Sequence, residues 1–211
     1  MNNQQQSLED LHHIKKMMER SSRFISLSGL SGICAGLCAL IGAWVAHPYV
    51  FGQKDFVING KKYFEDDYTF ILNTYLFWIA IATFVSAFVS AFFFTWLKSK
   101  KDGMPIWGNT AKRLMINVSI PLIVGSLFLF RMMHFGTFGL IAPGCLIFYG
   151  LGLINASKYT LIEIRYLGYI QIIIGIINLW LVGYGLYFWA IGFGVMHIFY
   201  GVYMWIKYER K

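Results

Sequence analysis

Long apolar stretches, separated by short polar connections, dominate the pattern along the chain. A helix that crosses a bilayer needs about 20 consecutive, mostly apolar residues. Six stretches meet this requirement, and Arg131 is the only Lys, Arg, Asp or Glu inside them. The pattern therefore predicts an all-α integral membrane protein with six transmembrane helices. The expected spans are 24–46, 69–94, 116–135, 137–156, 166–183 and 185–206.

Two connections between the expected spans are a single residue long. Gly136 separates the third span from the fourth, and Tyr184 separates the fifth from the sixth. Neighbouring glycines permit the dihedral angles that a sharp reversal requires. We therefore expect two tight antiparallel helix hairpins in the second half of the chain.

The first 23 residues are more polar and predict a short amphipathic helix before the first span. Apolar residues recur near helical spacing from Leu8 to Met18, and charged residues occupy the other faces. Such a helix can rest on anionic lipid. Alternatively, residues 8–22 can dock a cytoplasmic protein partner. A polar tail, residues 207–211, follows the last span.

The expected external loop 47–68 carries a β-hairpin signal. Asn59-Gly60 lies between two short runs rich in β-forming residues and supplies the two positions of a type I′ turn. Three acidic residues, 65–67, follow and match the positive end of the next helix dipole. The sequence therefore predicts a short external β-hairpin that leans on the helix bundle or the membrane surface.

The composition excludes a water-soluble protein. Hydrophobic residues make up 57% and charged residues 13% of the 211 residues, whereas a soluble domain carries about 25% charged residues. The mean hydropathy is +0.56. In a soluble protein the net charge of +8 would indicate nucleic-acid binding. Here the cations lie between apolar stretches, so we expect the lipid bilayer as partner and no nucleic acid.

The distribution of Lys and Arg predicts the orientation in the membrane. With six spans, 14 of the 18 cations fall on the side that holds both termini. The positive-inside rule places that side in the cytoplasm. The other side receives Lys54, Lys61, Lys62 and Arg131. We therefore expect a multi-pass protein with both termini cytoplasmic.

The segment from Met17 to Gly32, MMERSSRFISLSGLSG, resembles the opening of a group of small, uncharacterised multi-span bacterial proteins. The resemblance covers roughly the first fifth of the chain. It implies a location in the bacterial inner membrane and supplies no catalytic residues.

Small residues recur every four positions along the first span, in two adjoining stripes. One stripe contains Ser28, Gly32 and Gly36, and the other runs from Ser31 to Ala43. Small residues let helices approach closely. The stripes therefore predict a packing face inside the bundle or, alternatively, a homodimer face. A similar stripe in the second span consists of Ala82, Ser86 and Ser90.

The tetrapeptide Ile-Phe-Tyr-Gly occurs twice, at 147–150 and at 198–201. A Lys-Tyr pair follows each copy near the end of its span. The recurrence favours two related helix hairpins in spans three to six, a form found in transporters built from parallel repeats. Chance within a shared membrane composition is the alternative explanation.

The sequence contains no motif for catalysis or metal binding. There is no nucleophile elbow, HExxH pair, phosphate loop or dinucleotide fingerprint. The three cysteines lack the spacing of a metal site. We therefore expect no catalytic residue, no metal and no cofactor, and predict that the protein is not an enzyme. Glu163 is expected in a surface ion pair with Lys158 or Arg165.

Three residues at the expected outer boundary offer binding chemistry. His47 and His134 lie at a similar depth, which would permit bis-histidine haem ligation. Arg131, one turn before His134, can extend to the outer headgroups. Otherwise Arg131 is a candidate for binding an anionic lipid or ligand.

The last expected hairpin holds the main candidate site. Gln171, Gly175 and Asn178 share one face of the fifth span, and polar residues in a membrane tend to face the bundle interior. His197 lies at the same depth on the sixth span, counted at about 1.5 Å per residue, and Gly175 is expected to leave room for its ring. The group can be interhelical hydrogen bonding, or a site that binds a ligand or a proton.

Three functions remain open from the sequence. The first is a non-enzymatic interaction or regulatory protein, with a possible cytoplasmic partner. The second is a small transporter or permease-like unit with a polar site at His197, Gln171 and Asn178. The third is a haem protein.

Overall fold

The computed structural model describes residues 28–51, 75–103 and 107–210. The predicted N-terminal helix and the predicted hairpin around Asn59-Gly60 lie outside these residues. Within them every regular element is helical, so the prediction of an all-α fold is confirmed for the described part of the chain.

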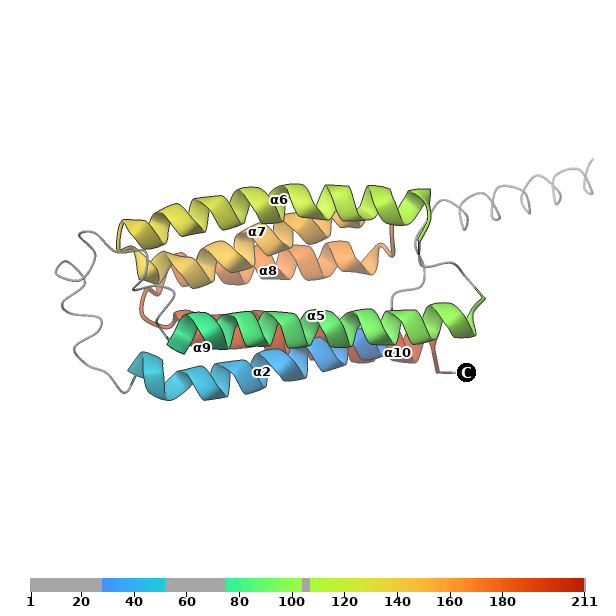
Figure 1. Cartoon of the computed structure of the whole chain (residues 1–211), viewed down its shortest axis with the longest axis horizontal. Coiled ribbons are helices and arrows are strands. Elements are labelled where there is room, and N and C mark those ends of the chain that lie inside the picture. Colours follow the sequence, from blue (N-terminus) through green and yellow to red (C-terminus); the bar gives the residue numbers. More distant parts are fainter. Residues whose placement is uncertain (1–27, 52–74, 104–106, 211) are drawn as a thin grey trace, which may run out of the picture.

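The described residues form a bundle of long helices joined by short turns (Figure 1). Three consecutive segments, α9, η2 and α10, make one continuous helix from Gly185 to Tyr208. The segment η2 is a π-helix inside this continuous helix. The elements in chain order are α2 (Gly29–Phe51), α5 (Tyr75–Lys101), α6 (Asn109–His134), η1 (Phe138–Leu140), α7 (Ile141–Ala156), α8 (Glu163–Trp180), α9 (Gly185–Trp189), η2 (Ala190–Val195) and α10 (Met196–Tyr208).

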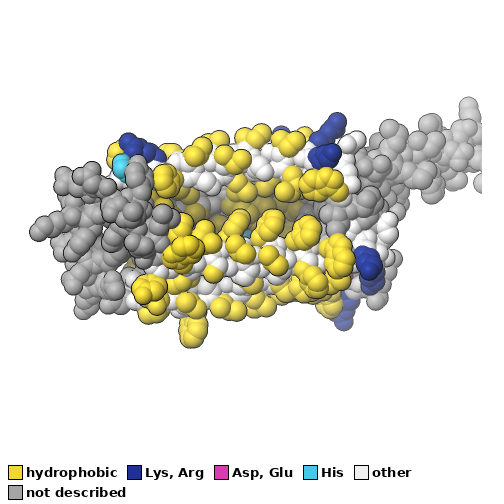
Figure 2. Space-filling view, viewed as in Figure 1, with side chains coloured by type: hydrophobic (Ala, Val, Ile, Leu, Met, Phe, Trp, Pro, Cys, Tyr) yellow, Lys and Arg dark blue, Asp and Glu magenta, His cyan; other side chains and the backbone are white. Residues whose placement is uncertain are grey.

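Five segments of the described residues are long and apolar enough to cross a membrane: α2, α5, α6, η1 with α7, and α9 through α10. Large hydrophobic side chains cover the middle of the visible face, whereas Lys and Arg gather near the ends of the helices (Figure 2). The helix α8 is not one of the five, because Glu163, Arg165, Gln171 and Asn178 interrupt its apolar sequence.

The long helices are arranged in two layers (Figure 1). In one layer α7 packs between α6 and α8, and in the other α2 packs between α5 and the α9–α10 helix. The layers meet where α9, η2 and α10 contact α7 and α8. A groove of about 230 Å³ along α5 is lined only by apolar side chains of that helix, among them Phe88 and Trp96.

The small residues of α2 pack inside the bundle, as their spacing predicts. Gly36 approaches the backbone so closely that a Cβ atom there would lie 2.6 Å from the Gly194 carbonyl oxygen. Gly32 faces Gly201 in the same way. In the second stripe Ser31, Ala39 and Ala43 are buried.

For the second span the expectation that its stripe packs inside the bundle is wrong, and the alternative of a homodimer face stays a prediction. Ala82 and Ser86 are exposed, and Thr83 is the residue of α5 that contacts α2 at Gly42. The Ser86 hydroxyl donates to the carbonyl of Thr83 one turn earlier. Its polarity is therefore satisfied within its own helix and needs no neighbouring helix.

Each glycine of the repeated Ile-Phe-Tyr-Gly marks a close helix crossing. A Cβ atom at Gly150 would lie 2.7 Å from the carbonyl oxygen of Gly168 on α8, and one at Gly201 would lie 2.6 Å from that of Gly29 on α2. The two copies thus play the same packing role, one in each layer. Duplication of the hairpins stays a hypothesis.

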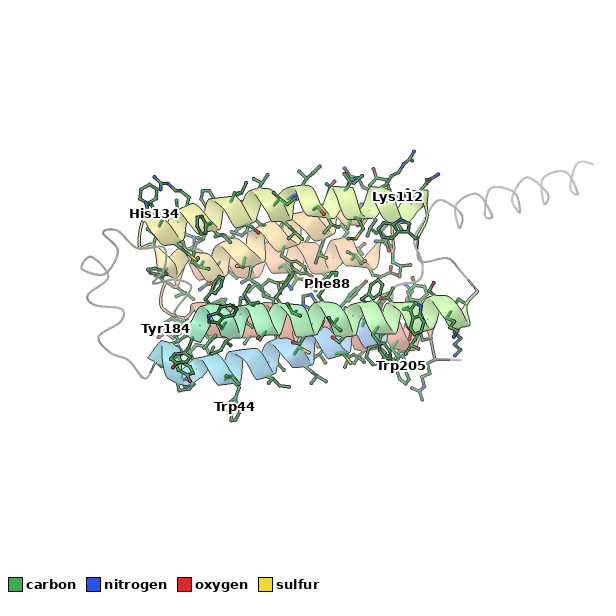
Figure 3. All side chains as sticks on the ribbon, in the orientation of Figure 1. Trp44, Phe88, Lys112, His134, Tyr184 and Trp205 are labelled. Carbon is green, nitrogen blue, oxygen red and sulfur yellow. The ribbon has the colours of Figure 1, made fainter. Side chains whose placement is uncertain are left out.

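Glu209, which follows α10, ties this helix to α2 and α5, the other two helices of its layer. Its carboxylate accepts a hydrogen bond from the Gly29 backbone N–H at 2.6 Å and forms an ion pair with Lys98 of α5 at 3.2 Å. A carboxylate at a helix N-terminus also matches the positive end of the helix dipole. The contact therefore joins α2, α5 and α10 at the end of the bundle that Trp205 marks (Figure 3).

Candidate functional site

Polar residues lie on the buried face of α8, which packs against α7. Gln171 and Asn178 are fully buried, and Glu163 is 7% exposed. The three positions are separated by eight and seven residues, which is close to two helical turns each time. They therefore share one face of α8, and its exposed face is apolar.

His197 of α10 is also buried, and both of its ring nitrogens have partners. Nδ1 lies 3.0 Å from the carbonyl oxygen of Gly192, and Nε2 lies 2.7 Å from the hydroxyl of Tyr149 on α7. An amide oxygen can only accept, so Nδ1 carries the proton and donates it. Nε2 is then the acceptor, and the Tyr149 hydroxyl donates to it.

The Gly192 carbonyl connects His197 to α8. The side-chain amide of Gln171 donates to this oxygen at 2.7 Å, so one carbonyl receives hydrogen bonds from two buried side chains. Gly192 belongs to the π-helical segment η2, and single π-turns inside α-helices are frequent at functional sites. A Cβ atom at Gly192 would lie 2.6 Å from Gln171 Oε1, so the contact requires glycine.

Aromatic rings surround this junction. Phe193 stacks on the His197 ring at a centroid distance of 6.0 Å and an interplanar angle of 19°. The ring centroid of Phe193 lies 5.1 Å from that of Tyr149 and 5.2 Å from that of Trp189. We call Tyr149, Trp189, Phe193 and His197 the aromatic cluster. It lines the junction between the two layers.

Glu163 lies at the end of α8 that meets the last turn of α10. Its Oε1 accepts hydrogen bonds from Lys207 Nζ at 2.5 Å and from the Tyr208 hydroxyl at 2.6 Å. The expected pairing with Lys158 or Arg165 is therefore wrong. A buried carboxylate is costly unless charged or hydrogen-bonding partners compensate it, and here Lys207 and Tyr208 supply both.

Four buried oxygens in the described residues have no hydrogen-bond partner. They are Glu163 Oε2, Gln171 Oε1, Asn178 Oδ1 and the Tyr200 hydroxyl. The orientation of the amides is fixed, because the nitrogen of Gln171 donates to Gly192 and that of Asn178 donates to the Leu181 carbonyl at 3.2 Å. Three of the four unpartnered atoms can therefore only accept.

Tyr200 lies on α10 three residues after His197, so the two side chains are neighbours on one side of that helix. Its hydroxyl is the fourth unpartnered oxygen, and the Tyr149 hydroxyl donates to His197. We call the set from Glu163 through Tyr200, Tyr149, His197 and Gln171 to Asn178 the polar track. It runs from the Lys207 end of the bundle to the turn after α8.

The sequence placed some of these residues correctly. Gln171 and His197 meet at one carbonyl, as their depths predict. Asn178 lies further along the same face and bonds to the turn after α8. The expected role of Gly175 is wrong: a Cβ atom there would lie 3.0 Å from the Pro143 carbonyl oxygen of α7, so this glycine makes room for α7 and not for His197.

Tyr149, Gly192 and Tyr200 were missed as members of the site. The repeated Ile-Phe-Tyr-Gly contained a signal, because its two tyrosines are Tyr149 and Tyr200. The hydrophobic pattern gave no sign of the π-helical turn, since glycine and apolar residues fit an α-helix equally well there.

The candidates Arg131, His134 and His47 are not members of the track. Arg131 is exposed near the end of α6, and its guanidinium lies 4.3 Å from the centre of the Phe135 ring. His134 marks the same end (Figure 3) and contacts Phe135. His47 contacts Tyr187 and lies on α2, in the other layer. These separate surroundings give no support to one haem held by both histidines.

Among the described residues, no three His, Cys, Asp or Glu side chains come together as a metal site would need. Comparisons with protein-family models, with curated proteins and with solved structures find no match to this chain. The class is therefore defined by the fold and the site. The protein is a helical bundle with several helices suited to crossing a membrane and a polar track in its interior.

Proposed function

We propose that the protein crosses the bacterial inner membrane six times, with α8 as the fifth span and both termini in the cytoplasm. The helix α8 has 18 residues and is about 27 Å long at 1.5 Å per residue, close to the bilayer core of about 30 Å. Its outer face is apolar, with Ile170, Ile173 and Ile176 exposed. Its polar residues face inward, as expected of a span in a bundle.

Reporter fusions test this topology. Fusions after Asn59 and after Gly183 should report the outer side, and fusions after Lys158 and after Lys211 should report the cytoplasm. The fusions after Lys158 and after Gly183 decide whether α8 crosses the membrane, because these two sites lie before and after that helix. Reporters after Lys158 and Gly183 on a shared side would remove α8 as a span.

We propose further that the polar track binds a small polar ligand, which makes the protein a small transporter or permease-like unit. The observation that carries this proposal is the set of buried acceptors at Glu163, Gln171 and Asn178. A buried polar atom without a partner costs about 1–3 kcal/mol. Buried polar groups at membrane depth are costly and commonly mark substrate or ion pathways.

Apolar replacement distinguishes a binding site from structural hydrogen bonding. Asn178→Leu removes an unpartnered oxygen and one long hydrogen bond, so its melting temperature in detergent should match or exceed that of the wild type. The matched control is Asn155→Leu, because Asn155 donates to the Asn117 carbonyl at 2.8 Å and joins α7 to α6. That variant should unfold at a lower temperature.

Native mass spectrometry from lipid nanodiscs supplies the second measurement. The wild type and Asn155→Leu should carry a bound small molecule that Asn178→Leu and Gln171→Leu lose. If the wild type carries none, or if Asn178→Leu is as destabilised as Asn155→Leu, the track is hydrogen bonding between helices and the proposal fails.

A regulatory or interaction role through residues 8–22 stays the second candidate from the sequence, and these residues lie outside the described part of the chain. Pull-down with and without residues 1–23 tests it. A cytoplasmic protein retained only by the longer chain would favour that role.

A further inference from the structure

The free hydrogen-bonding capacity of the polar track points to one kind of ligand chemistry. Each side-chain nitrogen of Gln171, Asn178 and His197 has one hydrogen-bond partner, and each amide keeps a second N–H. The buried atoms without any partner are all oxygens, and those of Glu163, Gln171 and Asn178 can only accept. An anion would meet these acceptors with repulsion. A ligand that satisfies these three oxygens must therefore donate hydrogen bonds.

The charge of the site is negative at one end. Glu163 is the only acidic side chain of the track, and Lys207 and Tyr208 both bind its Oε1, leaving Oε2 unpartnered. The Lys207 side chain is 43% exposed whereas that of Glu163 is 9% exposed. The lysine can therefore move into water, while the carboxylate stays in place and can exchange one cation for another.

The aromatic cluster supplies a second feature that favours cations. The ring centroids of Tyr149 and Trp189 lie 5.1 Å and 5.2 Å from that of Phe193. Aromatic faces attract cations through the ring quadrupole, most strongly where water is excluded. The aromatic rings thus favour a cation over an anion in the middle of the track.

The acceptors recur at regular intervals along α8. From Glu163 to Gln171 the rise is about 12 Å, and from Gln171 to Asn178 it is about 10 Å, at 1.5 Å per residue. A cation can occupy one acceptor at a time, which resembles the multi-site arrangement that allows ions both to enter and to leave a pore.

We infer that the polar track takes a small ammonium-type cation, either ammonium itself or a primary amine head group, with Glu163 at its mouth. The inference rests on the proposed function, because it names the ligand class of the same site. Ammonium from solution and the amine head group of phosphatidylethanolamine share this chemistry. The experiment below separates these two sources.

The test uses the full chain in nanodiscs of phosphatidylcholine and phosphatidylglycerol, whose head groups present no N–H donor. Thermal unfolding is followed during titration with the chloride of ammonium, methylammonium, potassium or tetramethylammonium at constant ionic strength. Ammonium and methylammonium should raise the melting temperature in a saturable manner. Potassium and tetramethylammonium, which are cations without N–H donors, should not.

Two variants should shift the ammonium affinity in opposite directions. Glu163→Gln removes the charge at the mouth and should weaken binding by about tenfold, as expected for one charged hydrogen bond. Lys207→Met removes the competing cation and should tighten it. The second variant keeps the test informative if the first does not fold.

The outcomes separate the two proposals. If potassium or tetramethylammonium stabilises as well as ammonium, or if both variants bind ammonium like the wild type, the ammonium inference is overturned while a polar-ligand site stands. If no titrant raises the melting temperature and native mass spectrometry finds no bound molecule, the polar track is not a ligand-binding site and the proposed function fails. Stabilisation by phosphatidylethanolamine without added ammonium identifies the lipid head group as the source.

Discussion

Replacing Gly150 with alanine should lower the free energy of unfolding by about 1–3 kcal/mol, the usual cost of forcing extra atoms into a packed interior. The new Cβ would lie 2.7 Å from the Gly168 carbonyl oxygen and 3.1 Å from the Ile172 nitrogen. Both are backbone atoms of α8, so relief requires the two helices to separate. Unfolding in detergent, followed by tryptophan fluorescence against temperature or denaturant, measures the loss.

The matched control is Gly152→Ala, two residues further along α7. Gly152 is also buried, but a Cβ there would lie 3.6 Å or more from its neighbours, which is ordinary contact. Alanine is also the better helix former, by about 1 kcal/mol. This variant should match or exceed the wild type in stability. Equal losses from both substitutions would mean that α7 and α8 do not cross at Gly150.

Removing one hydroxyl from each copy of the repeated Ile-Phe-Tyr-Gly should have opposite consequences. Tyr149→Phe leaves His197 Nε2 buried without a donor and should cost about 1–3 kcal/mol. Tyr200→Phe removes a hydroxyl that has no partner and should leave stability unchanged or raise it. The two proteins differ from the wild type by one oxygen each, so their volumes match.

Thermal unfolding of the two phenylalanine variants, without added ligand, provides the comparison. The double variant of Tyr149→Phe with His197→Leu should recover part of the loss, because no unpaired nitrogen then remains. If Tyr149→Phe and Tyr200→Phe have the same melting temperature, the hydrogen bond between Tyr149 and His197 does not form in the folded protein.

The helices were predictable because their signal is local. Runs of apolar residues predicted the five apolar helices. The four-residue spacing of Gly32 and Gly36 predicted the face of α2 that packs against η2 and α10. Depth was predictable too, since the rise per residue brought Gln171 level with His197.

The errors all concern which helices are neighbours. A glycine at position 175 can make room either for a histidine ring or for the backbone of another helix. Only the position of α7 decides that Gly175 faces Pro143. Ser86 matched a small-residue stripe, but α2 meets Thr83. Glu163 had two cations nearby in sequence, yet the end of α10 brings Lys207 closer. Such choices depend on contacts between distant segments, which a periodic pattern does not encode.

The crossing of α2 with α10 sets an order of events during synthesis. The helix α2 leaves the ribosome first among the described helices and α10 leaves last. Until α10 is made, the close contacts of Gly29 and Gly32 with it cannot form, and the Gly29 N–H lacks its Glu209 acceptor. The packing of the first described helix therefore depends on the last one, and the bundle becomes complete only when α10 packs against the glycines of α2.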